Sequence, residues 1–489
     1  MIILLGLIVP LIAILFESYP RLVNRKFGVD IWTHLLYLKE YKRQKGIPKK
    51  IEGGFLVPGE YDYPPAFITL LSRIPIPIVE KYEFLFSPIF DSLHLFLIFG
   101  LVLGLTQNIY LALLTQLLYV VTPIVVLENS SATPRSLGYT LFTITFMLLY
   151  FFGVSQNYYL LVGAILVGSL IFLSHRFTSQ GFLFYSIIFS IFFGTVSYIF
   201  AFVLSFTLAI IISRKFYLKV LRGHLGNLKF WYNVIDFRFY HQIKGAPAKN
   251  SSNDFVFNLY NQFLKFPPFI LAITNPWVIA SIFYLFIGSR SGIVNYLIVW
   301  VLTSYVLAIL TLWVHKLRFL GEGQRYLELS AFPAAFVAAQ LFLEFFNAKN
   351  PFVVGLYSFI IALCIVTIVV IQRKAIIKDR LRTITPELEE LFKYLRSQKK
   401  KPRLLCIPHQ ITTNVIYHTG CSVFVNADYA NISKISDVYP YMKLDVAKVM
   451  KKHDLDAIIL NEEYASIQDL KLKKYTVEKK FGNYLLITL

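Results

Sequence analysis

The sequence predicts a polytopic α-helical membrane protein of about eleven transmembrane helices, followed by a small C-terminal α/β domain. Three observations support this fold class. The 489 residues are 56% hydrophobic and 17% aromatic, and their mean hydropathy of +0.59 exceeds what a soluble core requires. Apolar runs of about 20 residues, the length that crosses the hydrocarbon layer, recur in the first three quarters of the chain. Strand-like runs alternate with helical patterns only after Pro402.

The predicted spans are apolar segments of at least roughly 15 residues each. They cover 1–16, 86–105, 108–127, 137–153, 157–173, 181–195, 197–213, 268–287, 292–313, 328–346 and 352–371. The first, MIILLGLIVPLIAILF, has no basic start and no small-residue cleavage site, so we expect a retained anchor rather than a cleaved signal peptide. Residues 181–213 form either two short helices hinged near Gly194 or one long tilted helix. The second choice would reverse the direction of every later span.

With a hinge near Gly194, all the long connections fall on one side of the membrane, and the other side has only short turns. Of the 48 Lys and Arg residues, only Arg290 and Lys349 lie in those turns. An enzyme that acts on a lipid-linked substrate needs such an arrangement, because the substrate phosphate lies at one interface. Alternatively, the distribution has no functional meaning, because any membrane protein with its domains on one side shows the same count of Lys and Arg residues. The long connections are 17–85, 174–180, 214–267, 314–327 and 372–489.

The orientation of this side follows from two opposing signals. A plain count of basic residues places it in the cytoplasm, but that rule weakens for long loops. Three N-x-S triplets, at Asn129, Asn250 and Asn431, favour the outside. We therefore expect a multi-pass protein of the cell membrane with an extracytoplasmic active face and C-terminal domain.

The loops at 17–85 and 214–267 are expected to contain amphipathic helices that lie on the bilayer, because DIWTHLLYLKEYKRQ and SRKFYLKVLRGHLGNLKFWYNVIDFRFYHQ mix apolar and cationic residues at helical spacing. The formal net charge is +20. Since the basic residues lie in loops and in the tail, they are expected to meet lipid headgroups, phosphates or an anionic substrate, and nucleic acid is not an expected partner. The sequence does not predict an oligomeric state.

The tail divides into a charged connecting helix at 372–401 and a small domain at 402–489 with a partly parallel sheet. The domain has no G-x-G-x-x-G turn, so it is not predicted to bind a nucleotide. Its C-x-x-H and H-x-x-C pairs are Cys406 with His409 and His418 with Cys421. Zinc could use these side chains, although the interval between the pairs is shorter than in common zinc fingers. Buried free thiols are favoured over zinc or a Cys406–Cys421 disulfide.

Asp30 and His34, in FGVDIWTHLLYLKEY, are the first candidates for chemistry. Four residues apart in a helix, they share a face and could act on one proton or one metal ion. Partial desolvation at the water–lipid boundary would favour the Asp30 carboxylate as a general base. Alternatively, Asp30 caps the helix that follows it. In the same loop, Glu60 is assigned to turn chemistry, whereas Asp62 could join Asp30 and His34 as a ligand of Mg or Mn.

The first loop resembles that of a known enzyme superfamily. GVDIWTHL, followed by a further helix, KGIP and YDYPP, is similar to the first extracytoplasmic loop of GT-C glycosyltransferases, which use polyprenyl-phosphate-linked sugars. The D-x-x-x-H-L spacing resembles archaeal oligosaccharyltransferase catalytic subunits, and the Tyr-Pro-Pro turn resembles the mannosyl- and aminoarabinosyl-transferase branches. The resemblance implies that Asp30 is the catalytic base or a metal ligand. The tail lacks a WWDYG-like acceptor-reading motif, so transfer of a single sugar is favoured over transfer of an oligosaccharide to an Asn sequon.

Such a donor leaves as an anionic lipid phosphate, which a planar guanidinium group binds well. An Arg-Tyr pair before a span also resembles the phosphate-handling loop of GT-C enzymes. Each arginine could instead be an interfacial anchor, and the histidine could hydrogen-bond between helices. The candidates are Arg318, Arg325 and Tyr326 in HKLRFLGEGQRYLELSAFP, Arg135 beside Glu128 in ENSSATPRSLG, and His175 and Arg176 in LSHRFTSQ.

The leading hypothesis is an inverting, polyprenyl-phosphate-sugar-dependent glycosyltransferase that acts on a lipid, glycan or protein acceptor. Asp30 would be the general base, and Arg325, with Arg135 or Arg318, would stabilise the departing lipid phosphate. A transporter or lipid flippase, or a non-catalytic membrane scaffold, is the alternative. Transport is less favoured because the sequence shows no internal repeat. The ionisable residues Asp91, His94 and Glu344 lie near span ends rather than at mid-membrane.

Overall fold

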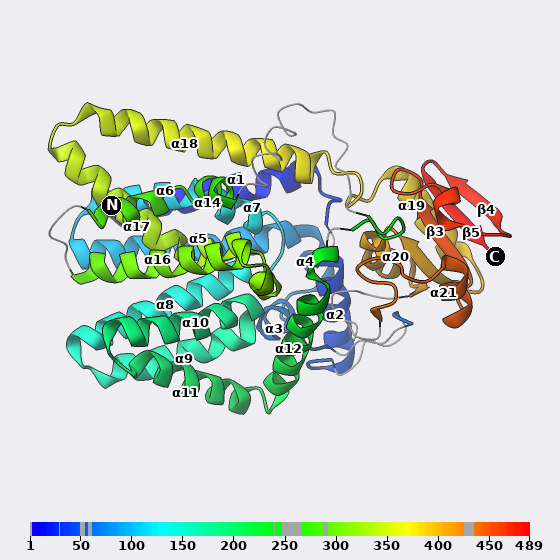
Figure 1. Ribbon diagram of the computed structural model, residues 1–489, viewed down its shortest axis with the longest axis horizontal. Helices are drawn as coiled ribbons and strands as arrows, with labels where there is room; N and C mark the ends of the chain where they lie inside the picture. Colours follow the sequence, from blue (N-terminus) through cyan, green and yellow to red (C-terminus); the bar gives the residue numbers. More distant parts are fainter. Residues whose placement is uncertain are drawn as a thin grey trace. The chain divides into compact units, whose positions relative to one another are not determined.

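The computed structural model separates into two compact units (Figure 1). Unit 1 consists of Met1–Val23, Phe84–Leu218 and Ser252–Ile376, and unit 2 of Asn24–Glu83, Lys219–Ser251 and Ile377–Leu489. Unit 1 contains the long apolar helices, whereas unit 2 collects most of the two long loops together with the tail. The residues described are 2–28, 30–48, 54–56, 61–238, 240–246, 267–286, 292–424 and 435–489.

Within the described residues, each predicted span corresponds to one or two helices of unit 1. Two of the spans are broken: α6 and α7 meet at a 60° bend, and Asn275–Trp277 separate α14 from α15. The elements of this unit are α1 (Ile2–Val23), α5 (Phe86–Thr106), α6 (Ile109–Val120), α7 (Pro123–Asn129), α8 (Arg135–Ser155), α9 (Tyr158–Ser174), α10 (Arg176–Phe193), α11 (Ser197–Ile212), α14 (Pro267–Thr274), α15 (Val278–Tyr284), α16 (Gly292–Trp313), η3 (His315–Leu320), η4 (Gly323–Ser330), α17 (Ala331–Asn347) and α18 (Pro351–Gln372).

Among the described residues, six helices are long and apolar enough to cross a membrane, or up to eight if each bent pair is counted as one span. This number is smaller than the predicted eleven because α9, with 17 residues, and the broken segments are short for a full crossing. The polytopic membrane fold class is confirmed. Many apolar side chains on the outer helices, α1 and α18 among them, are exposed, as expected of surfaces that face lipid.

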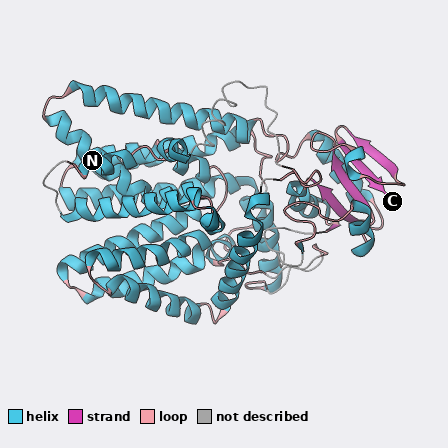
Figure 2. Cartoon of the chain, viewed as in Figure 1, coloured by secondary structure: helices cyan, strands magenta, loops and turns pink. Residues whose placement is uncertain are grey.

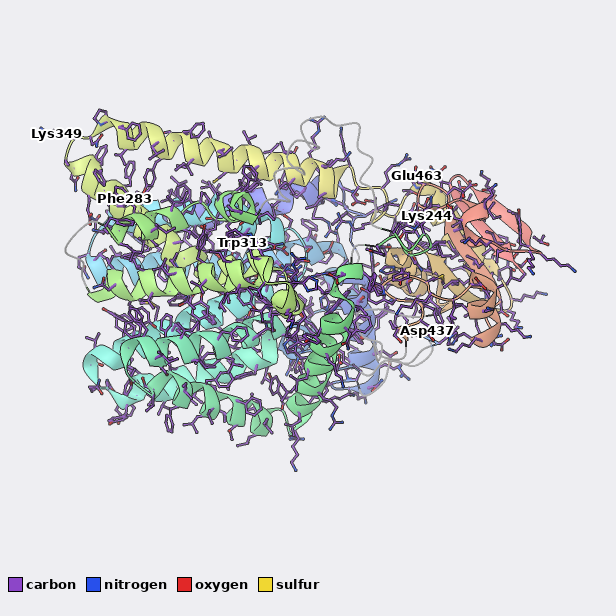
Figure 3. All side chains as sticks on the ribbon, viewed as in Figure 1. Lys244, Phe283, Trp313, Lys349, Asp437 and Glu463 are labelled. Carbon is purple, nitrogen blue, oxygen red and sulfur yellow. The ribbon has the colours of Figure 1, made fainter. Side chains whose placement is uncertain are left out.

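The segment at 181–213 forms two separate helices, α10 and α11, as the hinge hypothesis predicted. Between them, Gly194 has φ +64°, a left-handed conformation that glycine adopts without strain at a helix C-terminus. The turns α8–α9, α10–α11 and α17–α18 lie at one end of unit 1 (Figure 1), where Figure 3 labels Lys349. The exposed aromatic residues Tyr158 and Tyr159 follow the α8–α9 turn. Aromatic side chains are enriched at membrane–water interfaces, so this end is expected to lie at one.

Unit 2 is built around a five-stranded sheet with the order β2-β1-β3-β5-β4 (Figure 2). The strands β2, β1 and β3 are parallel, and β5 pairs antiparallel with β3 and β4, which confirms a partly parallel sheet. The strands are β1 (Arg403–Ile407), β2 (Ser422–Val423), β3 (Ala457–Asn461), β4 (Thr476–Phe481) and β5 (Tyr484–Thr488). The helices are α2 (Asp30–Gln44), α3 (Ala66–Leu71), α4 (Ile76–Tyr82), most of α12 (Phe216–Val234), α19 (Pro386–Ser397), α20 (Thr412–Thr419) and α21 (Val446–Lys452).

The charged connection differs from the single helix expected over 372–401. A short π-helix follows α18, residues 378–385 are not helical, and α19 begins at Pro386. The Thr385 hydroxyl accepts a hydrogen bond from the Leu388 amide. A threonine cap followed by proline at the first helical position starts a helix, so this pair separates two segments that composition alone would join.

Both long loops are bound to the C-terminal domain within unit 2. Gly54 and Leu56 of the first loop exchange backbone hydrogen bonds with Val423 of β2. From the second loop, the Gln242 amide donates to Tyr464 Oη (2.7 Å), and the Met442 amide donates to Gln242 O (2.7 Å). The domain predicted at 402–489 is thus the centre of a larger structure that includes parts of both loops.

Candidate active site

The acidic candidate Asp30 is the first residue of α2, and its side chain is exposed. The helix forms because apolar residues such as Ile31, Leu35 and Leu38 recur at helical spacing and are buried. A carboxylate in the first turn is stabilised by the helix dipole. At this position Asp30 can stabilise the helix end and remain accessible to an acceptor hydroxyl group.

His34 lies one turn further along α2 and is buried. Its ring contacts the rings of Phe67 and Tyr63 at centroid distances of 5.5 and 6.1 Å. Burial lowers the pKa of His34, and the charge of Asp30 acts in the opposite direction. The imidazole is therefore neutral near pH 7. Nδ1 has no hydrogen-bond partner in the described part of the chain, and such an atom is unusual in a buried ring.

The third metal-ligand candidate, Asp62, packs against α12. A side-chain carbon at Gly223 would overlap Asp62 Oδ2, so glycine is required for this close approach. Among the residues that the structure describes, no three His, Cys, Asp or Glu side chains gather in a group that could hold a metal ion. The set of Asp30, His34 and Asp62 therefore stays a prediction, and Glu60 lies outside the described residues.

Arg135 is the centre of a buried ionic cluster in unit 1. Its Nη1 is paired with Glu128 Oε2 and lies 3.6 Å from Glu328 Oε1. The Tyr139 hydroxyl group donates to Glu328 Oε2, and the ring of Tyr139 meets that of His175 edge-on at 6.1 Å. Only 13% of the Arg135 side chain is exposed. Two carboxylates already neutralise this guanidinium group, so its predicted contact with a lipid phosphate competes with them.

Arg325 and Tyr326 are adjacent in η4 but lie in different environments. Arg325 is partly exposed, and its Nε forms an ion pair with Glu322 Oε2 at 2.8 Å. Tyr326 is buried, and its hydroxyl accepts a hydrogen bond from Gln180 Nε2 at 2.6 Å. Arg325 could therefore reach an external anion, whereas Tyr326 joins η4 to α10. The exposed Arg318 lies in η3, before η4.

His175 precedes α10, and its Nδ1 forms a 2.9 Å hydrogen bond with Thr178 Oγ1 of that helix. Sequence reasoning named Arg135 with Glu128, and His175 apart from them; in unit 1, Tyr139 connects His175 to the Arg135 cluster. Sequence reasoning missed Glu328 and Tyr139, which complete the cluster. The only sequence signal for Glu328 is an acidic residue at the start of a predicted span, where an unpaired charge would be costly.

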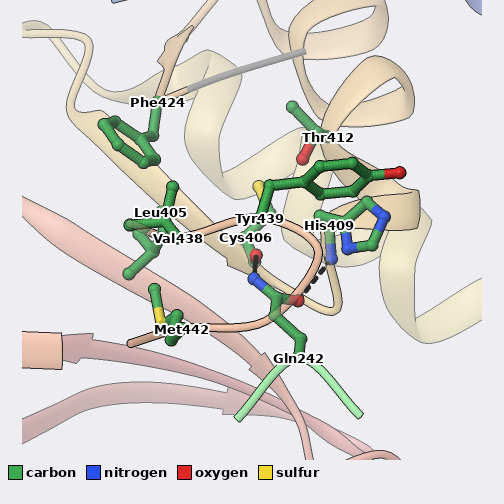
Figure 4. Close-up of a pocket in the computed structure, with 9 residues that line it drawn as sticks. All are labelled: Gln242, Leu405, Cys406, His409, Thr412, Phe424, Val438, Tyr439 and Met442. Carbon is green, nitrogen blue, oxygen red and sulfur yellow. Dashed lines mark hydrogen bonds between the residues drawn. The ribbon is translucent and has the colours of Figure 1, made fainter. Parts of the chain in front are cut away.

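The cysteine and histidine pairs of the tail do not form a metal centre among the described residues. All three cysteines, Cys364, Cys406 and Cys421, are free and buried, as the sequence favoured. Burial raises the pKa of Cys406 to about 12. Figure 4 shows the small pocket beside Cys406, where Gln242 receives a hydrogen bond from the His409 amide (2.8 Å).

No protein-family model and no curated protein sequence matches the chain. Its fold is similar to that of the oligosaccharyltransferase of Archaeoglobus fulgidus. A structure of that enzyme with zinc and sulfate superposes with a TM-score of 0.62 at 12% identity, covering 93% of this chain and 68% of that chain. A structure of the same enzyme, AglB, with an inhibitory peptide and a dolichol-phosphate gives 0.61 at 12% identity, with 95% and 70% covered.

A structure of ArnT from Cupriavidus metallidurans bound to undecaprenyl phosphate covers 98% of this chain and 97% of that chain at 11% identity, but its TM-score is 0.42. A score this low carries no argument about the fold. The similarity to the archaeal enzyme establishes the fold, which is of the GT-C type. The architecture expected from the first-loop motif is thereby confirmed.

Proposed function

We propose that this chain is a membrane glycosyltransferase that takes a sugar from a polyprenyl-phosphate-linked donor and transfers it with inversion to a lipid, glycan or protein acceptor. Two observations carry the proposal. The fold matches a dolichol-phosphate-bound oligosaccharyltransferase along 95% of the chain, and the D-x-x-x-H loop presents Asp30 as an exposed carboxylate at the start of a helix.

In the proposed reaction, the acceptor hydroxyl oxygen attacks the anomeric carbon of the donor sugar. A bond forms between that oxygen and that carbon, and the bond from the anomeric carbon to the phosphate oxygen breaks. Its electron pair leaves with the lipid phosphate, and the acceptor proton passes to the Asp30 carboxylate. The exposure of Asp30 supports this role, because a base must come within hydrogen-bonding distance of the acceptor.

The departing phosphate needs cations, and arginine matches its oxygens in geometry and charge. Arg325 and Arg318 suit this role because both side chains are at least partly exposed. Arg135 would contribute if the phosphate replaced Glu128 in its pairing. Tyr326 would act through the position of η4, since its hydroxyl group is hydrogen-bonded to Gln180.

A divalent ion such as Mg or Mn enters the proposal only as an ion for which Asp30, His34 and Asp62 would be the ligands. The unpartnered Nδ1 of His34 and the neighbouring Asp30 offer two suitable donors. The described residues do not bring a third acidic or histidine side chain to them, so no step of the reaction is assigned to a metal.

The acceptor and the side of the membrane belong to the proposal as well. The absence of a WWDYG-like motif from the sequence favours a single sugar as the transferred group. An active face and C-terminal domain outside the cytoplasm would suit a lipid-linked donor whose phosphate lies at that surface. Membrane lipids are the expected surroundings, and nucleic acid is not an expected partner.

Full-length protein in proteoliposomes tests the proposal. The vesicles would receive polyprenyl-phosphate-linked sugars and a membrane extract as the source of acceptors, and mass spectrometry would follow the release of polyprenyl phosphate. We expect Asp30→Asn to lower the rate by about 10²-fold or more, because a general base contributes at least this much. The unfolding midpoint should not change.

Asp437→Asn is the matched control, since Asp437 is an exposed acid on the C-terminal domain (Figure 3). This variant should release lipid phosphate at the rate of the unmodified protein. Full activity of Asp30→Asn would exclude Asp30 as the base. Accumulation of donor inside the vesicles without any glycosylated product would favour a transporter instead.

A further inference from the structure

Two carboxyl groups meet inside the helical bundle of unit 1, apart from every residue used in the proposed reaction. Glu17 lies on α1 and Asp91 on α5, and both side chains are 0% exposed. Both helices are candidate membrane spans. The two carboxyl groups are within hydrogen-bonding distance of each other.

The outer oxygens of this pair have neutral partners. Asn129 Nδ2 lies 3.5 Å from Glu17 Oε1 as a donor, and the Tyr119 hydroxyl group donates to Asp91 Oδ1 at 2.7 Å. The remaining oxygens, Glu17 Oε2 and Asp91 Oδ2, receive no donor from the described protein. Two ionised carboxylates in contact in an apolar interior repel each other strongly. A single proton shared between the two groups would remove this repulsion.

A chain of hydrogen bonds leads through the bundle to Asp91. His94 Nδ1 lies 3.0 Å from Tyr119 Oη, and His94 Nε2 lies 2.9 Å from Thr143 Oγ1. Because the Tyr119 proton is donated to Asp91, Tyr119 must accept from His94 Nδ1–H. His94 Nε2 then accepts from the Thr143 hydroxyl group. This tautomer is the one that the network requires, and every donor in the chain points towards Asp91.

We propose that Glu17 and Asp91 form a proton-binding site within the membrane helices, with the proton carried by Glu17 and donated from Oε2 to Asp91 Oδ2. Asp91 is then an ionised carboxylate that accepts from Tyr119 on one oxygen and from Glu17 on the other. Bonds to an ionised acceptor are shorter and stronger than neutral ones. The site joins α1 to α5, and the chain through Tyr119, His94 and Thr143 extends it to α6 and α8.

Two further charged groups complete the surroundings. Arg21 lies four residues after Glu17 on α1, and Glu328 is close enough to Tyr119 to act on it electrostatically. A proton, unlike a metal cation, has negligible size. It therefore fits between two oxygens that are already in hydrogen-bond contact.

The assignment predicts an asymmetry between two conservative substitutions. In Glu17→Gln, a side-chain amide replaces the protonated acid and still donates to Asp91, so the unfolding midpoint in detergent should stay near that of the unmodified protein. In Asp91→Asn, an amide nitrogen replaces one of the two acceptor oxygens and faces the donor of either Tyr119 or Glu17, so the midpoint should fall by several degrees. Equal losses in both variants would contradict the assignment.

Infrared difference spectroscopy of the full-length protein provides a readout that does not depend on activity or stability. The carbonyl band of a buried protonated carboxylic acid should be present, shift in deuterated water, and disappear in Glu17→Gln. Glu344→Gln, which removes an acid on α17, should leave the band unchanged. A band that persists in Glu17→Gln would place the proton elsewhere and overturn the proposal.

Metal analysis separates a proton from a metal ion between the same oxygens. The purified protein should contain no metal in a one-to-one ratio that depends on Glu17. A stoichiometric ion that is lost in Glu17→Gln, together with the absence of the protonated-acid band, would show a cation site and refute the proton.

Discussion

The indole ring of Trp32 meets the imidazole ring of His418 edge-on, with ring centroids 4.5 Å apart. Trp32 belongs to α2 of the first loop, and His418 to α20 of the C-terminal domain. Next to them, the Lys39 ammonium group lies 3.6 Å from the ring centroid of Tyr417, whose hydroxyl group donates to Glu80 (3.1 Å). The C-terminal domain therefore packs against the same helix that begins with Asp30.

Removing this contact should loosen the first loop. Trp32 is 8% exposed, and truncation of such a buried tryptophan typically costs about 3 to 5 kcal/mol. We expect Trp32→Ala to lower the unfolding midpoint and to increase protease cleavage between residues 24 and 83. Trp313→Ala is the control, because 53% of that tryptophan is exposed. If Trp32→Ala were as stable and as protease-resistant as the control, the contact would not hold the loop.

Substitutions in the Arg135 cluster can separate a structural role of Arg135 from a role in substrate binding. Arg135→Gln leaves Glu328 buried without its cation, which should cost about 3 to 5 kcal/mol of unfolding free energy. Arg135→Gln with Glu328→Gln should recover much of this loss, because the buried Glu328 charge is then removed and only the partly exposed Glu128 remains without its cation. Arg318→Gln, on an exposed side chain, should not change the stability.

The same double variant then reports on catalysis. A stable double variant with little release of lipid phosphate would mean that Arg135 also acts on the donor. A stable and fully active double variant would confine Arg135 to a structural role. Failure of the second substitution to recover stability would contradict the pairing of Arg135 with Glu328.

The C-terminal domain should lose stability in mild acid. Burial lowers the pKa of both His409 and His418 to about 4, and for His418 the nearby Lys39 and Arg396 act in the same direction while Glu389 opposes them. The unfolded chain binds these protons near the ordinary value of about 6.5. Between pH 6.5 and 4 the unfolded state therefore holds more protons, and stability falls as the pH falls.

Unfolding midpoints measured from pH 7.5 to 4.5 test this dependence. We expect a loss on the order of 2 kcal/mol from the two rings together, after allowance for solvent screening. His409→Gln with His418→Gln should flatten the profile over this range, whereas the unmodified protein should show the slope. Identical profiles would mean that other groups cause the acid sensitivity.

Several features of the fold could be predicted because they depend on local sequence. Apolar runs predicted the helices of unit 1, and Gly194 marked the turn between α10 and α11. The buried strands β1, β3 and β5 were visible as short apolar runs. The strand β4 carries no such signal, because TVEKKF is charged and almost wholly exposed. Lysine-rich edge strands of this kind prevent pairing with other chains, and their composition resembles that of a loop.

The candidate site was harder to predict than the helices. Asp30, Arg325 and Arg135 could be proposed from residue type and position next to spans. Glu328 was not, since its partner Tyr139 is 189 residues away in the chain. The pairing of Glu17 with Asp91 was missed for the same reason: each alone resembles an acid near the end of a span.

The sequence alone specified the class of protein and the helices of unit 1, because hydrophobic length and glycine turns act locally. Which polar groups meet inside the bundle depended on helix packing, since a buried charge is stabilised by whichever partner the fold brings to it. The attachment of Trp32 to His418 likewise required the folded domain, where surfaces far apart in the chain become adjacent.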